Sequence, residues 1–228
     1  MPTARIRLCA LALATAGVLF VLYPATRPWT DESTAEGALT AMSSPAWVAS
    51  HLFAIIGFVL VPLGLLGVHA VLSRTRAERL AAAAVVAAWI GAGLTLPYYG
   101  AEDFCLHGIA SEAVAGQPVD LLAVADAVRF HPVAATTFLL GLLVLAVGAV
   151  LTAIAVWRSP VLPRPSALAF ALGFTLFIPQ FFTPAAVRIG HGVLVGVGCV
   201  LLALALWRTT DSADQAGPVD IAARPGQG

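Results

Sequence analysis

Six long apolar runs constrain this chain more than any other feature of its sequence. A helix needs about 20 mostly apolar residues to cross ~30 Å of hydrocarbon, and each run is near that length. We therefore predict an all-α fold, a polytopic membrane bundle of about six transmembrane helices. These form one integral-membrane domain over residues 1–208, placed in the cell membrane. The runs cover residues 6–23, 46–72, 80–99, 132–157, 166–182 and 187–207.

Composition agrees with a chain that lives in a bilayer. Hydrophobic residues make up 60% of the 228 and charged residues only 11%, whereas a soluble protein carries about 25% charged residues. The formal net charge of +0 leaves no basic excess with which to bind nucleic acid. There is no Gly-rich phosphate loop and no zinc-ligand spacing. We therefore predict the lipid bilayer and a hydrophobic small molecule as partners, with no nucleic acid, no metal and no cofactor.

The first run, residues 6–23, could be mistaken for a signal peptide because Arg5 and Arg7 flank its start. It is longer than the usual apolar core of a signal peptide, and the sequence YPAT at its end is a poor cleavage site. We interpret it as a membrane anchor.

The distribution of arginine predicts the orientation. All 12 basic residues are arginines, and nine of them fall on the side that holds both termini. Because cytoplasmic loops carry the excess of positive charge, we predict that both termini are cytoplasmic. Arg27, Arg129 and Arg188 fall on the external side. Residues 209–228 are polar and contain Pro and Gly, so we expect a disordered cytoplasmic tail.

The external loops are long and the internal ones short. Residues 25–45 and the stretch from about 100 to 131 form the external connections. Within them, residues 31–42 and 119–130 have enough helical character to form short interfacial helices.

Polar side chains at membrane depth are expensive, so they mark candidate sites. Counting ~1.5 Å per residue from the internal arginines places one polar layer in the outer leaflet. We predict one aromatic-lined pocket there, formed by the second, third, fifth and sixth apolar runs and lined by Tyr98, Glu102, Gln180 and His191. The residues of the layer are Tyr98, Tyr99, Glu102, Asp103, Gln180, Arg188, His191 and His51, with Trp47, Phe181 and Phe182 supplying further rings.

Two short stretches carry most of this layer. In residues 97–107, a helix that continues past Pro97 would stack Tyr98 on Glu102 one turn apart. In residues 177–182, Pro179 frees a backbone carbonyl that neighbouring groups must satisfy.

Each of these residues also has a structural interpretation. The two acids could face water beyond the helix end, and the aromatic residues could form the usual interfacial belt. His191 could be a packed hydrogen-bonding group between helices. Arg188 could form a purely structural ion pair with Glu102 or Asp103.

The combination of acidic and aromatic residues in 97–103 and 179–182 resembles the small integral-membrane terpene cyclases, which are helical bundles of similar length. The resemblance implies an isomerase that protonates and cyclises a prenyl chain on a lipidic or prenylated aromatic substrate. Glu102 would donate the proton, with Asp103 tuning or replacing it. The rings and polar groups of the layer would bind the substrate, and aromatic faces would stabilise the cation.

Two other functions fit the same residues. The protein could be a non-enzymatic transporter or accessory membrane protein. It could also be a membrane redox protein in which His51 and His191 hold a haem.

Overall fold

The structure is a computed structural model that describes residues 2–215. Helices are the regular secondary structure of this part of the chain, which contains no strand. The elements in order are α1 (Thr3–Thr26), α2 (Ala35–Met42), α3 (Pro45–Leu72), α4 (Glu78–Gly100), the π-helix η1 (Ala101–Cys105), α5 (Leu106–Val114), α6 (Leu121–Arg129), α7 (Pro132–Trp157), the 3-10 helix η2 (Arg164–Ala167), α8 (Leu168–Thr175), the 3-10 helix η3 (Pro179–Phe182) and α9 (Ala185–Gln215).

Five helical segments of the described chain are long and apolar enough to cross a membrane. They are α1, α3, the rod formed by α4, η1 and α5, α7, and the Ala185–Asp211 part of α9. This confirms the predicted multi-pass helical membrane protein. The rod also confirms that the helix continues past Pro97, since it runs without a break from Glu78 to Val114.

The apolar run 166–182 does not form one continuous helix. It starts in η2, continues in the eight-residue α8, and ends in η3. Pro179 accounts for the interruption between α8 and η3, because proline has no backbone N–H to donate to the carbonyl one turn earlier. The expected single helix in this run is therefore divided into three short pieces.

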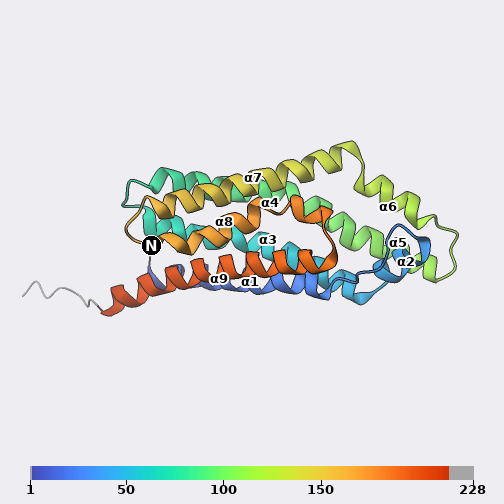
Figure 1. Cartoon of the computed structure of the whole chain (residues 1–228), viewed down its shortest axis with the longest axis horizontal. Coiled ribbons are helices and arrows are strands. Elements are labelled where there is room, and N and C mark those ends of the chain that lie inside the picture. Colours follow the sequence, from blue (N-terminus) through green and yellow to red (C-terminus); the bar gives the residue numbers. More distant parts are fainter. Residues whose placement is uncertain (1, 216–228) are drawn as a thin grey trace, which may run out of the picture.

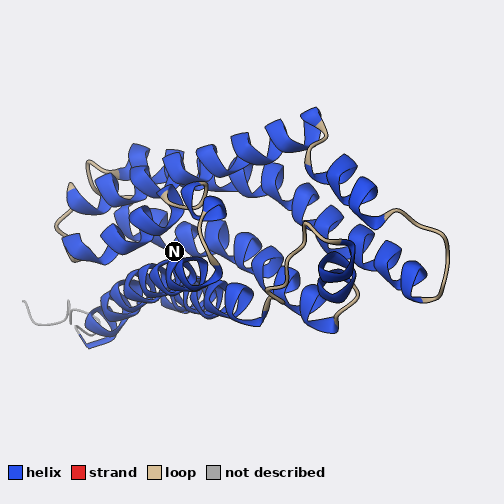
Figure 2. Cartoon of the chain, turned by 45° about the vertical axis from the view of Figure 1, so that its right-hand side comes forward, coloured by secondary structure: helices blue, strands red, loops and turns tan. Residues whose placement is uncertain are grey.

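The long helices lie side by side, and the short helices α2, α5 and α6 gather at one end of the bundle (Figure 1), which we call the capped end. The first turn of α1 and the last described turns of α9 lie together at the other end (Figure 1). Helix α1 packs between α3 and α9, and α4 packs along α7. The turned view in Figure 2 shows the capped end projecting beyond the long helices.

The structure can be compared with the predictions for the two interfacial helices and for the chain end. Segments 31–42 and 119–130 contain α2 and α6, each shorter than predicted. Helix α9 continues to Gln215 and so covers the start of the segment 209–228 that we expected to be disordered. Residues 216–228 of that segment lie outside the described residues.

Close backbone contacts between helices occur at glycines. A Cβ atom on Gly91 of α4 would lie 2.6 Å from the backbone nitrogen of Leu145 and 2.8 Å from the carbonyl oxygen of Gly141, both on α7. A Cβ atom on Gly17 of α1 would lie 2.8 Å from the carbonyl oxygen of Gly196 on α9. Small residues let membrane helices approach closely enough for dispersion contacts to hold them together.

Gly91→Ala is predicted to destabilise the bundle, because its methyl group would overlap the α7 backbone. Overpacking of this kind costs about 1–3 kcal/mol. Gly93→Ala is the matched control on the same helix, since a Cβ atom there meets nothing within 4 Å. Thermal unfolding in detergent should show a lower midpoint for Gly91→Ala and an unchanged or slightly higher one for Gly93→Ala. Equal midpoints would contradict the proposed α4–α7 contact.

Candidate functional site

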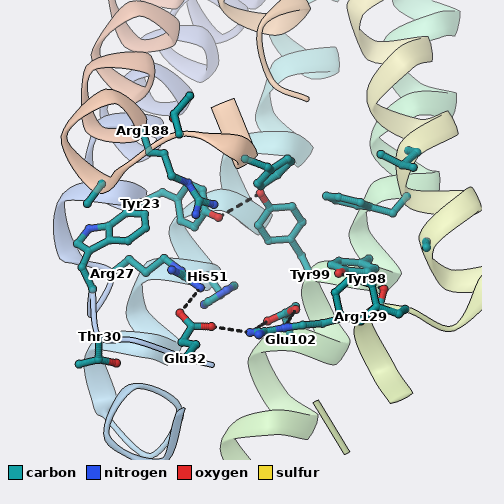
Figure 3. Close-up of a pocket in the computed structure, with 18 residues that line it drawn as sticks. Tyr23, Arg27, Thr30, Glu32, His51, Tyr98, Tyr99, Glu102, Arg129 and Arg188 are labelled. Carbon is teal, nitrogen blue, oxygen red and sulfur yellow. Dashed lines mark hydrogen bonds and ion pairs between the residues drawn. The ribbon is translucent and has the colours of Figure 1, made fainter. Parts of the chain in front are cut away.

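A cavity of about 640 Å³ lies where the long helices meet the capped end. It is lined by α1, α3, α4, η1, α6, α7, η3 and α9, and by the loop between α1 and α2 (Figure 3). Its size falls within the range of small-molecule sites. Charged and aromatic side chains line it together, which is unusual for a space inside a membrane bundle.

Four charged residues form an alternating chain across one side of the cavity (Figure 3). Nη2 of Arg27 lies 2.7 Å from one oxygen of Glu32, and Nη2 of Arg129 lies 2.8 Å from the other. Arg129 also donates two hydrogen bonds to the carboxylate of Glu102, from Nε at 2.6 Å and from Nη2 at 3.0 Å. Both glutamates are therefore ion-paired.

The ion pairs outweigh the cost of burying Arg129. Burial disfavours its charged form, but its hydrogen bonds to Glu102 and the negative charges of Glu102 and Glu32 raise the pKa of the Arg129 guanidinium above its ordinary value. The side chain thus stays charged and keeps α6 tied both to η1 and to the α1–α2 loop.

Trp47 supports this charged chain from α3. Its indole ring is fully buried, and its Nε1 donates a hydrogen bond of 2.9 Å to the backbone carbonyl of Glu102. The guanidinium groups of Arg27 and Arg129 lie 5.0 and 5.9 Å from the centre of the ring. Aromatic faces attract cations at such distances, so Trp47 helps to hold both arginines in place.

Arg188 differs from the other two arginines of the cavity. It reaches in from α9 (Figure 3), and its Nε donates a hydrogen bond of 3.1 Å to the side-chain oxygen of Gln180. Its guanidinium lies 4.9 Å from the ring centre of Trp29 and 5.3 Å from that of Phe181. Among the described residues, no carboxylate forms a salt bridge with it. The described lining contains three arginines and two glutamates, so its positive charges outnumber its negative ones.

Aromatic rings make up the rest of the wall. The hydroxyl of Tyr99 donates a hydrogen bond of 3.4 Å to that of Tyr23. Tyr98 stacks on Phe138 of α7 with ring centres 4.2 Å apart, and Phe138 contacts Phe181 at 5.8 Å. These rings give the cavity an apolar surface next to its charged groups.

Most of the predicted site residues come together here. Tyr98, Tyr99, His51, Glu102, Phe181 and Arg188 line the cavity. Trp47 lies behind the charged chain without being exposed to the cavity. Phe182 is 87% exposed and lies on the outer surface of the bundle.

Gln180 and His191 do not line the cavity itself. They line a small adjoining space of about 10 Å³, which shares Tyr23, Trp29 and Arg188 with the cavity. Nε2 of His191 donates a hydrogen bond of 2.8 Å to the backbone carbonyl of Gly173, so this histidine joins α9 to α8. His51 lines the larger cavity and His191 the smaller space, so the two do not face each other across one site as a haem would require.

The two candidate acids have opposite surroundings. Glu102 lines the cavity and pairs with Arg129. The alternative in which Arg188 pairs with Glu102 or Asp103 is not found among the described residues. Asp103 is fully buried, does not line the cavity, and has no hydrogen-bond partner for either carboxylate oxygen within the described structure. Both lie in η1, and π-turns of this kind are frequent at functional sites.

Sequence reasoning missed Tyr23, Arg27, Trp29, Glu32 and Arg129 as site residues. One signal could have found two of them, because Arg27, Arg129 and Arg188 are the arginines that fall on the predicted external side. All three line the same cavity. Charges that go against the orientation rule should have been treated as a group. No cluster of three or more His, Cys, Asp or Glu in residues 2–215 is placed to hold a metal ion.

Comparison of the chain with protein-family models, with curated proteins and with solved structures finds no match.

Proposed function

We propose that this protein is a non-enzymatic membrane binding protein, whose cavity takes an amphipathic molecule with an anionic group and an apolar body. The observation that carries the proposal is Arg188, a half-buried guanidinium that has no carboxylate partner among the described residues. Burying a charge without a counter-charge is costly. An anionic ligand would supply that counter-charge.

The chemistry of the site suits such a ligand. Arginine offers a planar fork of donors that matches carboxylate and phosphate groups. Arg27 and Arg129 are already neutralised by Glu32 and Glu102, which leaves Arg188 as the cation free to accept an anion. The rings of Tyr98, Phe138 and Phe181 contact one another in series and provide an apolar surface that begins beside Arg188.

The proposal includes the topology. The pieces η2, α8 and η3 return the chain from the end of α7 to the start of α9 (Figure 1), so this interrupted segment would be the sixth crossing. Both termini would then lie in the cytoplasm and the capped end outside the cell membrane. This orientation satisfies the arginine distribution and places the cavity at the outer leaflet.

Cysteine labelling in intact cells tests the orientation. In a background where the exposed Cys105 is replaced by serine, Ser33→Cys and Gln117→Cys should react with a membrane-impermeant maleimide. Thr75→Cys should react only after the cells are opened. Labelling of Thr75→Cys alone in intact cells would reverse the topology.

Arg188→Gln tests the proposed ligand. A hydrogen bond to a charged group contributes about 1.5–3 kcal/mol, so the variant should bind dodecyl phosphate about 10- to 100-fold more weakly than the parent protein. Dodecanol, which has the same chain without charge, should bind both proteins equally. Arg158→Gln, at an exposed arginine beyond the end of α7, is the control. Isothermal titration in a neutral detergent measures all of these affinities.

The result that would contradict this proposal is dodecyl phosphate binding that Arg188→Gln leaves unchanged. A parent protein that binds neither compound would also reject it, because the cavity would then accept no amphiphile.

Acid-initiated cyclisation of a prenyl chain is the second candidate. The observation that favours it is Asp103, whose buried carboxyl group has no partner in the described structure, together with the aromatic wall. Glu102 is poorly suited to donate a proton, because both of its carboxylate oxygens accept hydrogen bonds from Arg129. Three arginines around the cavity also disfavour a carbocation there. Asp103 does not line the cavity, so its proton would have to pass through a neighbouring group.

If the protein cyclises a prenylated aromatic substrate, Asp103→Asn should lower turnover by about 10²-fold or more. Glu102→Gln should cost less, and Glu112→Gln, at an exposed acid on α5, should change nothing. Mass spectrometry and chromatography of the isomerised product measure the rate. A parent protein without turnover removes this candidate, and a loss confined to Glu102→Gln would return the donor role to Glu102.

A further inference from the structure

We infer that the ligand is a membrane lipid with an anionic headgroup, and that it enters the cavity sideways from the bilayer through an opening between α7 and the η3–α9 junction. This inference rests on the proposed function, because it names the class of ligand that the same cavity takes. We call this place the lateral opening, lined by Ala135 and Leu139 on one side and Thr183 and Ala185 on the other.

The residues of the lateral opening belong to the cavity and to the outer surface of the bundle at once. Leu139 lines the cavity and is 43% exposed. Thr183 and Ala185, on the other side of the opening, line the cavity and are half-buried. The nearby Phe182 and Val187 do not line the cavity and are 87% and 51% exposed. In a membrane bundle such exposed apolar side chains face lipid chains. The cavity is therefore continuous with the surface that touches lipid.

The depth of the lateral opening matches the boundary between headgroups and chains. At ~1.5 Å per residue, Leu139 lies about 27 Å along α7 from Trp157, which pairs with Arg164 at the far end of the bundle. Arg188 lies ~30 Å along α9 from Arg208 by the same count. Since the hydrocarbon layer is ~30 Å thick, a headgroup at Arg188 would leave its chains at the level of the lipid chains outside.

The charged chain crosses the side of the cavity toward the capped end. Glu32 joins Arg27 to Arg129 across that side (Figure 3). The loop that carries Glu32 is itself held, because Nε1 of Trp29 donates to the carbonyl of Pro24 at 2.9 Å and the hydroxyl of Thr30 donates to the carbonyl of Gly37 at 2.7 Å. A ligand that entered through the charged chain would have to break its ion pairs, whereas a lipid that entered between α7 and the η3–α9 junction would leave them intact.

The charge of the site selects the headgroup. A single arginine without a counter-charge suits one phosphate or carboxylate group, and it offers nothing to a choline or ethanolamine cation. Phosphatidate has an anionic phosphate and two chains, so it is the probe of choice. Hexyl phosphate carries the same anionic group but is soluble in water. Comparing the two probes shows whether the site takes a lipid headgroup or a soluble anion.

The test uses the full-length protein in nanodiscs of phosphatidylcholine with a minor fraction of phosphatidate. Leu139→Trp fills the lateral opening, and Ala135→Phe fills it from one turn away, in case the first variant does not fold. Leu140→Trp is the matched control, because Leu140 is 52% exposed on the same helix but does not line the cavity. Native mass spectrometry of the released protein counts the bound phosphatidate, and thermal unfolding confirms that each variant is folded.

The parent protein and Leu140→Trp should retain phosphatidate in preference to phosphatidylcholine. Leu139→Trp and Ala135→Phe should retain about tenfold less, because the added ring occupies the path of the chains. Equal retention by all four proteins would overturn the lateral route.

The hexyl phosphate arm separates this inference from the proposed function. If the parent protein binds hexyl phosphate but retains no phosphatidate, the ligand is a soluble anion, so the inference fails while the anion site at Arg188 stands. If the parent protein binds neither probe, the proposed function fails as well.

Discussion

The absence of water inside a bilayer is the constraint on which this structure depends. Backbone polar groups in hydrocarbon must pair within the chain, so the apolar runs become helices, and the helices pack through glycines such as Gly91 and Gly17 where their backbones meet. The same constraint applies to charged side chains. Within the bundle they are gathered at one level and are paired wherever a partner exists, as Glu32 and Glu102 are. A charge at that level that has no partner among the described residues is therefore a candidate for binding a ligand.

The three arginines of the cavity are held in two different ways. Arg27 and Arg129 are held by two carboxylates and by the face of Trp47, and they fasten the α1–α2 loop and α6 to the bundle. Arg188 is held by the amide of Gln180 and by two aromatic faces, which orient its guanidinium without neutralising it. An arginine positioned in this way is ready for an anion before the anion arrives. Preorganisation of this kind reduces the cost of binding.

The acids Glu102 and Asp103 show where sequence reasoning stops. The sequence placed both just beyond the apolar run 80–99, and in the structure the rod from Glu78 to Val114 continues through them. The sequence could not show that a π-turn would widen the helix at this point and send adjacent carboxyl groups into different surroundings. It therefore favoured Glu102 as a proton donor, whereas Glu102 is ion-paired and Asp103 is the acid without a partner.

By itself the sequence determined the class of protein, the position of the long helices, and the level at which polar groups gather. These follow from length and hydropathy summed over about 20 residues, which are local properties. Only the tertiary structure decided which charges meet. Arg129 pairs with Glu102, 27 residues away, and with Glu32, 97 residues away, while Gln180 and His191 fall into an adjoining space. The physical reason is that an ion pair needs its atoms within about 4 Å, and such distances depend on how the helices are turned and shifted against one another by packing, which no local pattern encodes.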